Sequence, residues 1–150
     1  MCLTKIEYIS EIDSNTTQDV VALVTGNGSG TKLFQALLDN HEQNLFNVEQ
    51  EISETHTSIN VKPTLGDIRD RAVMDRIFSE NRPQVVLHAA AYKHVPIQEI
   101  NPWYAILTNV AGTQNIVELS STYKAEKFIL VSTDKAVHPV NVMGATKRLS

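Results

Sequence analysis

Short apolar runs, rich in valine, isoleucine and leucine, recur along this chain and are separated by longer segments with helical spacing. The three clearest runs are VVALV at 20–24, VVL at 85–87 and FILV at 128–131. Runs of this kind are typical of strands that are buried on both faces of a parallel sheet. The segments between them carry apolar residues three and four positions apart, as amphipathic helices do. This alternation predicts an α/β fold with a doubly wound parallel sheet.

The boundaries of the expected elements follow from proline and capping residues. Strands are expected near 20–25, 58–65, 85–89 and 127–132. Pro63 weakens the second strand or places it at a sheet edge, because proline has no N–H to donate. Asp70 can cap a helix that Pro83 ends, Pro102 opens another helix, and a last helix begins within 141–150.

Length and composition exclude several classes of protein. The chain has 150 residues, which suits one domain, and 1–19 is interpreted as a leader before it. The net charge of −4 argues against a dedicated nucleic-acid binder. A single cysteine, Cys2, excludes an internal disulfide and a cysteine-cluster metal site, so no metal is expected. The single cysteine also fits a reducing, cytoplasmic location, which is the expected one. There is no apolar run of the roughly 18 residues that span a membrane, and no signal-peptide core.

Polar residues follow the strands at the points where ligands bind in doubly wound sheets, the carboxyl ends. A glycine loop at 26–30 follows the first strand, and Gly66 and Asp67 follow the second. The segments 88–94 and 132–135 follow the third and fourth strands. The sequence therefore predicts one binding site at the edge of the sheet where these four strand ends converge.

The same segments resemble a known family. The blocks AAAYKHVP at 89–96 and STDKAV followed by NVMGATKR within 132–148 are very specific, and three further stretches match at 37–52, 65–78 and 101–118. They resemble the extended short-chain dehydrogenase/reductases. Within these, they are similar to the CapD-like group of capsule and O-antigen polysaccharide biosynthesis, the nucleotide-sugar 4,6-dehydratases.

The resemblance implies a Rossmann-like fold with bound NAD or NADP, in which 20–150 is a partial cofactor-binding domain. The fold is expected to be incomplete at the C-terminus, because the family's last strands and nucleotide-sugar domain would follow Ser150. The implied substrate is a UDP-N-acetylhexosamine, converted to a 4-keto-6-deoxy sugar, and a homo-oligomer is left open. One alternative is a catalytically inactive fragment or paralogue that binds a nucleotide or a partner. Another is a 4-epimerase or reductase of the same fold.

The resemblance also assigns catalytic roles. Thr133 would bind the sugar 4-hydroxyl, and Asp134 and Lys135 would be the acid–base pair for loss of water. Lys147 would hold the nicotinamide ribose. Met143 stands where the superfamily has a catalytic tyrosine and cannot take a proton, as in longer members of this dehydratase group. Asp134 is then the candidate base for the oxidation step.

The resemblance implies that the cofactor is bound by residues at the strand ends, by the acidic residue that matches the dinucleotide-binding pattern, and by residues on later helices. These are Gly26, Gly28, Gly30, Asp39, Asp67, Ile68, Ala89, Ala90, Ala91, Lys93, Asn109 and Lys147. Asp67 resembles the residue that binds the adenine amino group, although a capping carboxylate would look the same. Asn109 is interpreted as a tie between loops and His88 as a core histidine. Tyr92, Lys93 and His94 lie where the family lines its site, and Lys93 as a plain surface charge stays open.

The glycine loop departs from the dinucleotide-binding pattern. Asp39, the matching acidic residue, comes only 11 residues after Gly28, whereas the pattern places it about 20 residues on. A parallel crossover needs roughly a dozen residues or more. Either 33–38 stays extended after a non-standard connection, or 31–53 forms one helix that starts at the glycines and moves Asp39 away from any ribose. The helix is favoured, because it keeps a right-handed crossover and a phosphate site. A flexible linker is the third interpretation, and weak cofactor binding is expected at best.

Overall fold

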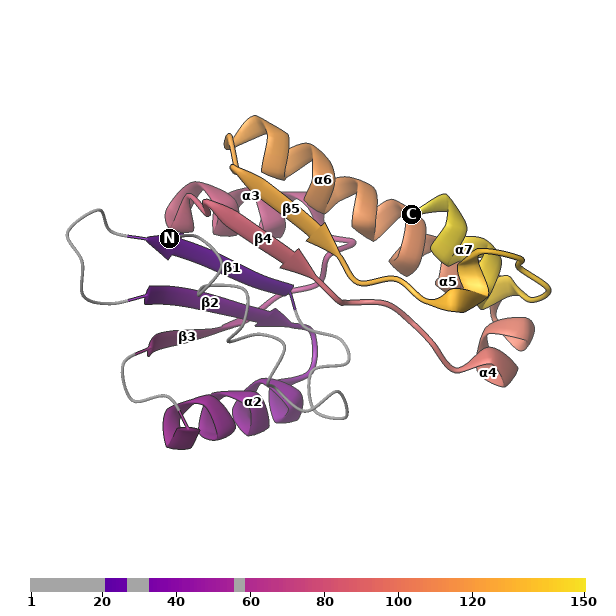
Figure 1. Cartoon of the computed structure of the whole chain (residues 1–150), viewed down its shortest axis with the longest axis horizontal. Coiled ribbons are helices and arrows are strands. Elements are labelled where there is room, and N and C mark those ends of the chain that lie inside the picture. Colours follow the sequence, from indigo (N-terminus) through magenta and orange to yellow (C-terminus); the bar gives the residue numbers. More distant parts are fainter. Residues whose placement is uncertain (1–20, 27–32, 56–58) are drawn as a thin grey trace.

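The computed structural model describes residues 21–26, 33–55 and 59–150 (Figure 1). The expected leader at 1–19 and two of the candidate glycines, Gly28 and Gly30, lie outside the described residues. In the described part, the strands are β1 (Val21–Gly26), β2 (Leu33–Asp39), β3 (Ile59–Leu65), β4 (Val85–His88) and β5 (Lys127–Leu130). The α-helices are α2 (Glu42–Thr55), α3 (Arg71–Asn81), α4 (Val95–Ile100), α5 (Pro102–Ala105), α6 (Thr113–Thr122) and α7 (Val142–Leu149). A π-helix, η1 (Ile106–Gly112), joins α5 to α6, and a 3₁₀ turn, η2 (Asp134–Ala136), precedes α7.

The strands form one sheet in the order β3-β2-β1-β4-β5. β2 pairs parallel with β3, and β4 pairs parallel with β5. β1, in the centre, is antiparallel to both of its neighbours, β2 and β4. The α/β class with a Rossmann-like sheet is therefore confirmed, but the expected all-parallel sheet is in fact mixed, with one reversed strand.

The connection between β1 and β2 explains the reversal. Gly26 pairs with Leu33, so only the six residues 27–32 join the two strands. That length is far too short for a parallel crossover, which needs a dozen or more residues, but it is long enough for a hairpin. The favoured helix over 31–53 is wrong, because residues 33–39 are a strand and the helix begins only at Glu42.

The side chains of β2 alternate between the two faces of the sheet, as a strand requires and a helix does not. Ala36 and Leu38 belong to one core cluster, whereas Leu37 belongs to the other. The first cluster is covered by α3 and α6, whose residues include Phe78 and Leu119. The second is covered by α2 through Leu45, Val48 and Ile52. Helices therefore cover both faces of the sheet, as Figure 1 shows.

Local sequence signals set the ends of several elements. The Asp70 carboxylate accepts hydrogen bonds from the backbone N–H groups of Ala72 and Val73, at 3.1 and 3.0 Å, and so caps α3. Pro63 lies in β3, one of the two edge strands of the sheet, as expected. Across the described residues there is no helix long and apolar enough to cross a membrane.

Close packing fixes the loop after β3 against the helices. A Cβ atom on Gly112 would lie 2.6 Å from Cδ1 of Ile68, so any larger residue there would have to displace the Ile68 side chain. Asn115, one turn further along, donates a hydrogen bond from Nδ2 to the carbonyl of Ile68 at 2.9 Å. These contacts hold the loop at 66–70 beside the carboxyl end of β4.

Candidate functional site

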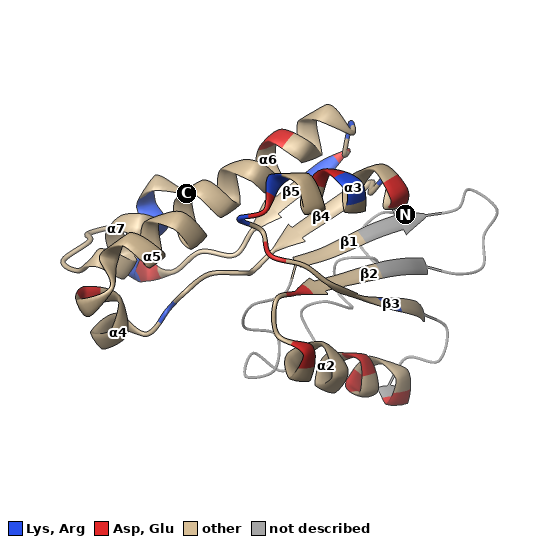
Figure 2. Ribbon diagram, turned by 180° about the vertical axis from the view of Figure 1, so that it is seen from behind, with Lys and Arg blue, Asp and Glu red and all other residues tan. Residues whose placement is uncertain are grey.

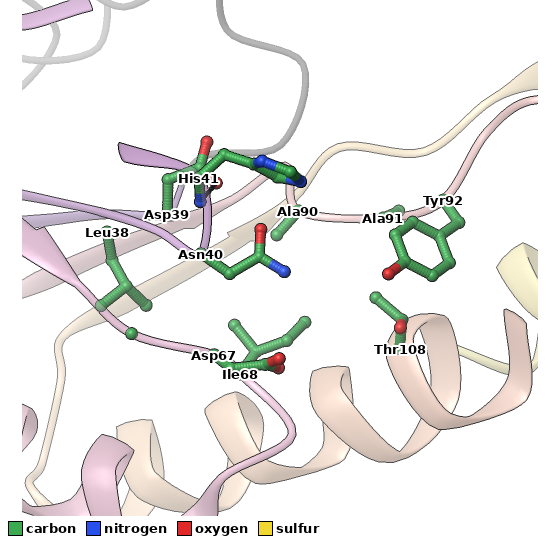
Figure 3. Close-up of a pocket in the computed structure, with 11 residues that line it drawn as sticks. Leu38, Asp39, Asn40, His41, Asp67, Ile68, Ala90, Ala91, Tyr92 and Thr108 are labelled. Atoms are coloured by element: carbon green, nitrogen blue, oxygen red, sulfur yellow. Dashed lines mark hydrogen bonds between the residues drawn. The ribbon is translucent and has the colours of Figure 1, made fainter. Parts of the chain in front are cut away.

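A pocket opens where the carboxyl ends of β2, β3 and β4 meet (Figure 3). Its lining residues come from those three strand ends and from η1: Leu38, Asp39, Asn40, His41, Gly66, Asp67, Ile68, Ala90, Ala91, Tyr92 and Thr108. Apolar side chains such as Leu38 and Ile68 form its walls. Asn40, Asp67, Tyr92 and Thr108 present polar groups around it, as Figure 3 shows. A hollow with apolar walls and a few polar groups is typical of small-ligand sites.

The carboxylate of Asp39 is held in place at the end of β2. The side chain is only 2% exposed. Its Oδ1 accepts the backbone N–H of His41 at 2.7 Å, and its Oδ2 accepts Nδ2 of Asn44 at 3.3 Å. Its backbone carbonyl accepts the N–H of Gly66 at 3.0 Å, which ties the end of β2 to the loop after β3. Because 33–39 is a strand, Asp39 lies at the pocket and is not carried away on a helix.

Asp67 forms the opposite rim of the pocket. Arg69 donates from Nε to both of its carboxylate oxygens, at 2.9 and 3.0 Å, and its backbone N–H donates to Oδ1 at 2.9 Å. The side-chain hydrogen bond from Arg69 is the main reason that the pKa of Asp67 lies below its usual value, and Asn40 lowers this pKa further. Asp67 is therefore an ionised acceptor, and the guanidinium of Arg69 is already paired with it.

Asn109 connects Tyr92, which lines the pocket, to Thr146 on α7. It is fully buried, and its Oδ1 accepts the N–H of Tyr92 at 2.7 Å. Its Nδ2 donates to the carbonyl of Tyr92 at 3.0 Å and to Oγ1 of Thr146 at 2.9 Å. All of its side-chain donors are used within the protein, so the structure places Asn109 as a tie between the loop after β4 and α7, as interpreted above.

A second polar cluster follows β5. Oγ1 of Thr133 donates to Oδ1 of Asp134 at 2.9 Å and accepts the N–H of Lys135 at 3.4 Å. The hydrogen bond from Thr133 is the main cause of a lowered pKa at Asp134. The side chains of Asp134 and Lys135 are both exposed. The cluster therefore offers a carboxylate and an amine to solvent, side by side.

Helix α7 supports this second cluster. Nζ of Lys147 donates to the carbonyl of Val131 at 3.0 Å, across the turn from α7 to the end of β5. Met143 lies on the same helix and is only 3% exposed, so its side chain is part of the packing. The structure thus brings Thr133, Asp134, Lys135 and Lys147 into one unit.

His88 lies in the interior at the end of β4. It is fully buried, and its Nε2 lies 2.9 Å from Oγ1 of Thr113. Burial, and then the positive charge of Lys147, lower the pKa of His88 to about 4. The ring is therefore neutral at pH 7, which agrees with the interpretation of a core histidine.

The structure does not bring all of the candidate residues together. Gly26 pairs with the first residue of β2, at the end of the sheet opposite Asp39. Of the four strand ends expected to form one site, those of β3 and β4 line the pocket, whereas residues 132–135 after β5 form the separate polar cluster. Ile68, Ala90 and Ala91 line the pocket, whereas the half-buried Ala89 does not. Lys93 lines a separate hollow beside His94.

Sequence reasoning missed four residues of the pocket, namely Leu38, Asn40, His41 and Thr108. Asn40 could have been found by the strand-end rule, since it directly follows Asp39. Thr108 had no such signal, because its position depends on the π-helical turn of η1. The lining residues fit the nucleoside end of the expected cofactor. The glycine end of β1 lies away from them and does not fit its diphosphate.

Comparisons with known proteins agree with this geometry. Residues 22–150 match the family described as polysaccharide biosynthesis protein. The capsular polysaccharide biosynthesis protein CapD of Staphylococcus aureus is 42% identical over 115 residues, which cover 76% of this chain and 19% of CapD. A UDP-N-acetylglucosamine 4,6-dehydratase (inverting) of Campylobacter jejuni is 36% identical over 139 residues, which cover 87% of this chain and 41% of that enzyme. The chain thus spans less than half the length of these relatives.

Solved structures share the fold. UDP-glucose 4-epimerase from Bifidobacterium longum, in complex with NAD⁺ and UDP, superposes with a TM-score of 0.62 at 25% identity, over 74% of this chain and 37% of that one. The chain is therefore a member of the polysaccharide-biosynthesis family of extended short-chain dehydrogenase/reductases, which includes nucleotide-sugar dehydratases and epimerases.

Proposed function

We propose that this chain supplies the nucleotide-binding and acid–base part of a nucleotide-sugar 4,6-dehydratase. The substrate would be a UDP-N-acetylhexosamine, and the product a 4-keto-6-deoxy sugar for a surface polysaccharide. In this proposal, 20–150 is a partial NAD(P)-binding domain that follows a leader. The relative from Campylobacter, named as a dehydratase of this kind, supports the substrate class.

The observation that carries the proposal is the pair formed by Asp134 and Lys135 at the end of β5. Loss of water across C5 and C6 of a sugar requires a base for one proton and an acid for the departing hydroxyl. Asp134 is ionised, because Thr133 and the N–H of Lys135 hydrogen-bond its carboxylate and lower its pKa. Both side chains are exposed, so a sugar can reach them. Epimerisation at C4 needs no such pair, which favours a dehydratase over an epimerase.

The nucleotide in this proposal is NAD or NADP, bound by its nucleoside end. Asp39 favours NAD, since an acidic side chain at the end of the second strand binds a ribose diol and repels a 2′-phosphate. Asp67, across the pocket, is an ionised acceptor that suits the amino group of adenine.

A chimera tests the proposed reaction. Residues 59–150 of this chain replace the corresponding segment of the Campylobacter dehydratase, which then keeps its own first strands and its own second half. We expect the chimera to form a 4-keto-6-deoxy product from UDP-N-acetylglucosamine, detected by NMR. The double variant Asp134→Asn, Lys135→Ala should lose about 10²-fold or more in rate. Val140→Ala, a control at a side chain that is 92% exposed, should keep the rate.

The other outcomes of this experiment are equally informative. A C4 epimer as the product would show an epimerase, and a folded chimera without product would contradict the acid–base assignment. The latter result would favour the second candidate function, a module that binds a nucleotide without catalysis. The reversed β1, which separates Gly26 from the pocket, is the observation that favours this second candidate.

A further inference from the structure

We infer that the pocket binds the nucleoside of an adenine nucleotide and gains no affinity from its diphosphate, so that this chain binds adenosine about as tightly as NAD. The inference rests on the proposed function, because it concerns the same site. It names the ligand as a nucleoside, whereas the family resemblance implies a whole dinucleotide.

The first step of the argument is the distance between the glycine end of β1 and the pocket. Gly26 pairs with Leu33, and Val21 pairs with Leu38, so the pocket lies at the Val21 end of β1. A strand of six residues is about 17 Å long from its first Cα to its last. Gly26 therefore lies too far from the pocket to donate its backbone N–H to a phosphate bound there.

The second step is the charge around the pocket. Helix α2, which follows β2 directly, carries four glutamates and no lysine or arginine, and one of the glutamates, Glu42, lies in its first turn. Figure 2 shows these acidic positions along α2. The guanidinium of Arg69 is already bound by Asp67. Of these glutamates, only Glu42 lies at the pocket end of α2, so a diphosphate beside Asp39 and Asp67 would meet Glu42, these two aspartates and a cation that is already paired.

The third step is what the pocket does offer. The apolar walls of the pocket, which can take a planar base, are formed by Leu38, Ile68, Ala90 and Ala91. Asn40 presents an amide to the space between them, and Asp67 lies across from it (Figure 3). An amide and a carboxylate can pair with the ring nitrogens and the exocyclic amine of a purine.

Thr108 adds an observation that itself points to a ligand. Its side chain is 93% buried and lines the pocket, yet its Oγ1 has no hydrogen-bond partner among the described residues. A buried hydroxyl without a partner is unfavourable, so a ligand hydroxyl or ring nitrogen that pairs with it gains affinity. Thr108 lies in the π-helix η1, and such turns are frequent at functional sites.

The experiment compares adenosine, AMP and NAD on the full chain by calorimetry or ligand-observed NMR. We expect dissociation constants that agree within about threefold. An NAD affinity ten or more times that of adenosine would overturn the inference but leave the proposed nucleotide-binding role intact. The absence of binding by all three would contradict both.

Thr108→Val tests whether the unpartnered hydroxyl of Thr108 contacts the ligand. We expect at least a threefold loss of adenosine affinity together with an unchanged or higher Tm, because the variant removes an unpaired buried polar atom without changing the side chain's shape. Thr122→Val, at an exposed position on α6, should leave adenosine affinity unchanged. Equal adenosine affinity in the parent and Thr108→Val would show that the hydroxyl does not face the ligand.

Discussion

The backbone carbonyl oxygen of Lys135 lies 2.5 Å from the position that a Cβ atom on Gly144 would occupy. Helix α7 therefore packs directly against the turn that carries Thr133, Asp134 and Lys135, and the absence of a side chain at Gly144 makes this contact possible. The orientation of the acid–base pair depends on this contact as well as on the capping bonds within the turn.

Gly144→Ala tests this contact, and two effects oppose each other in it. Alanine in a helix interior is favoured over glycine by about 1 kcal/mol. A clash with a backbone carbonyl costs about 1–3 kcal/mol, because neither partner can rotate away. We expect the clash to dominate, so that urea denaturation shows a net loss of stability. Ala145→Ser, on the exposed side of the same helix, should change stability by less than about 0.5 kcal/mol. A stabilised Gly144→Ala would contradict the packing described.

The lowered pKa of the buried His88 leads us to expect that the stability of the fold depends on pH. Its pKa is about 4 in the folded protein and 6.5 when unfolded, so the unfolded chain binds the extra proton first. Stability should therefore fall as pH decreases from about 6.5 to about 4, by a total of about 3 kcal/mol. The lowered pKa values of Asp67 and Asp134 act at lower pH, because their ordinary value is 3.8.

The measurement is urea denaturation at pH 7.0, 5.5 and 4.5, with His88→Gln as the comparison. The glutamine variant keeps a polar partner for Thr113 but cannot be protonated in this range. Its stability should be nearly flat across these three values. A similar slope in both proteins would assign the pH dependence to other groups.

Asn109→Ala should be one of the most damaging single substitutions in the described part of the chain. It leaves the N–H and the carbonyl of Tyr92 without partners and removes the bond to Thr146. The expected loss is about 2–4 kcal/mol, since several buried polar groups lose their partners at once. Asn115→Ala, which removes bonds to the carbonyls of a partly exposed loop, is the matched control and should cost less. Equal losses would contradict the tie described for Asn109.

Much of the fold could be predicted from local patterns. The wrong prediction, a helix over 31–53 where the structure has the strand β2, has a physical origin. The runs at 85–87 and 128–131 correspond to β4 and β5, because short, wholly apolar runs rich in β-branched residues favour a buried strand over a helix. In the segment LFQALLD at 33–39, leucines at 33, 37 and 38 fit helical spacing and also fit a strand buried on both faces. The neighbouring strands decided between these patterns, since Leu37 and Leu38 fill cores on opposite faces of the sheet.

The candidate site was predictable where it depends on strand ends and not where it depends on strand direction. Asp67 lies at the pocket, as the strand-end rule requires, whereas Asp39 lies there because 33–39 is a strand and not part of the favoured helix. The same rule misplaced Gly26, because it assumes that every strand of the sheet runs the same way. Direction is set by the length of the connection, and the short spacing from Gly28 to Asp39 was the signal for a hairpin.

The last prediction concerns Met143, in the chimera described above. Met143→Tyr removes no proton path, because methionine takes no part in proton transfer, so the rate should fall by far less than in Asp134→Asn, Lys135→Ala. The side chain is only 3% exposed, however, and a tyrosine ring is larger. We therefore expect a stability loss of about 1–3 kcal/mol from overpacking, with the rate per folded molecule nearly kept. Unfolding curves and the rate of 4-keto-6-deoxy product formation, measured on the same preparations, separate the two effects. A Met143→Tyr chimera as inactive as the double variant would show that Met143 is required in the reaction and not only in packing.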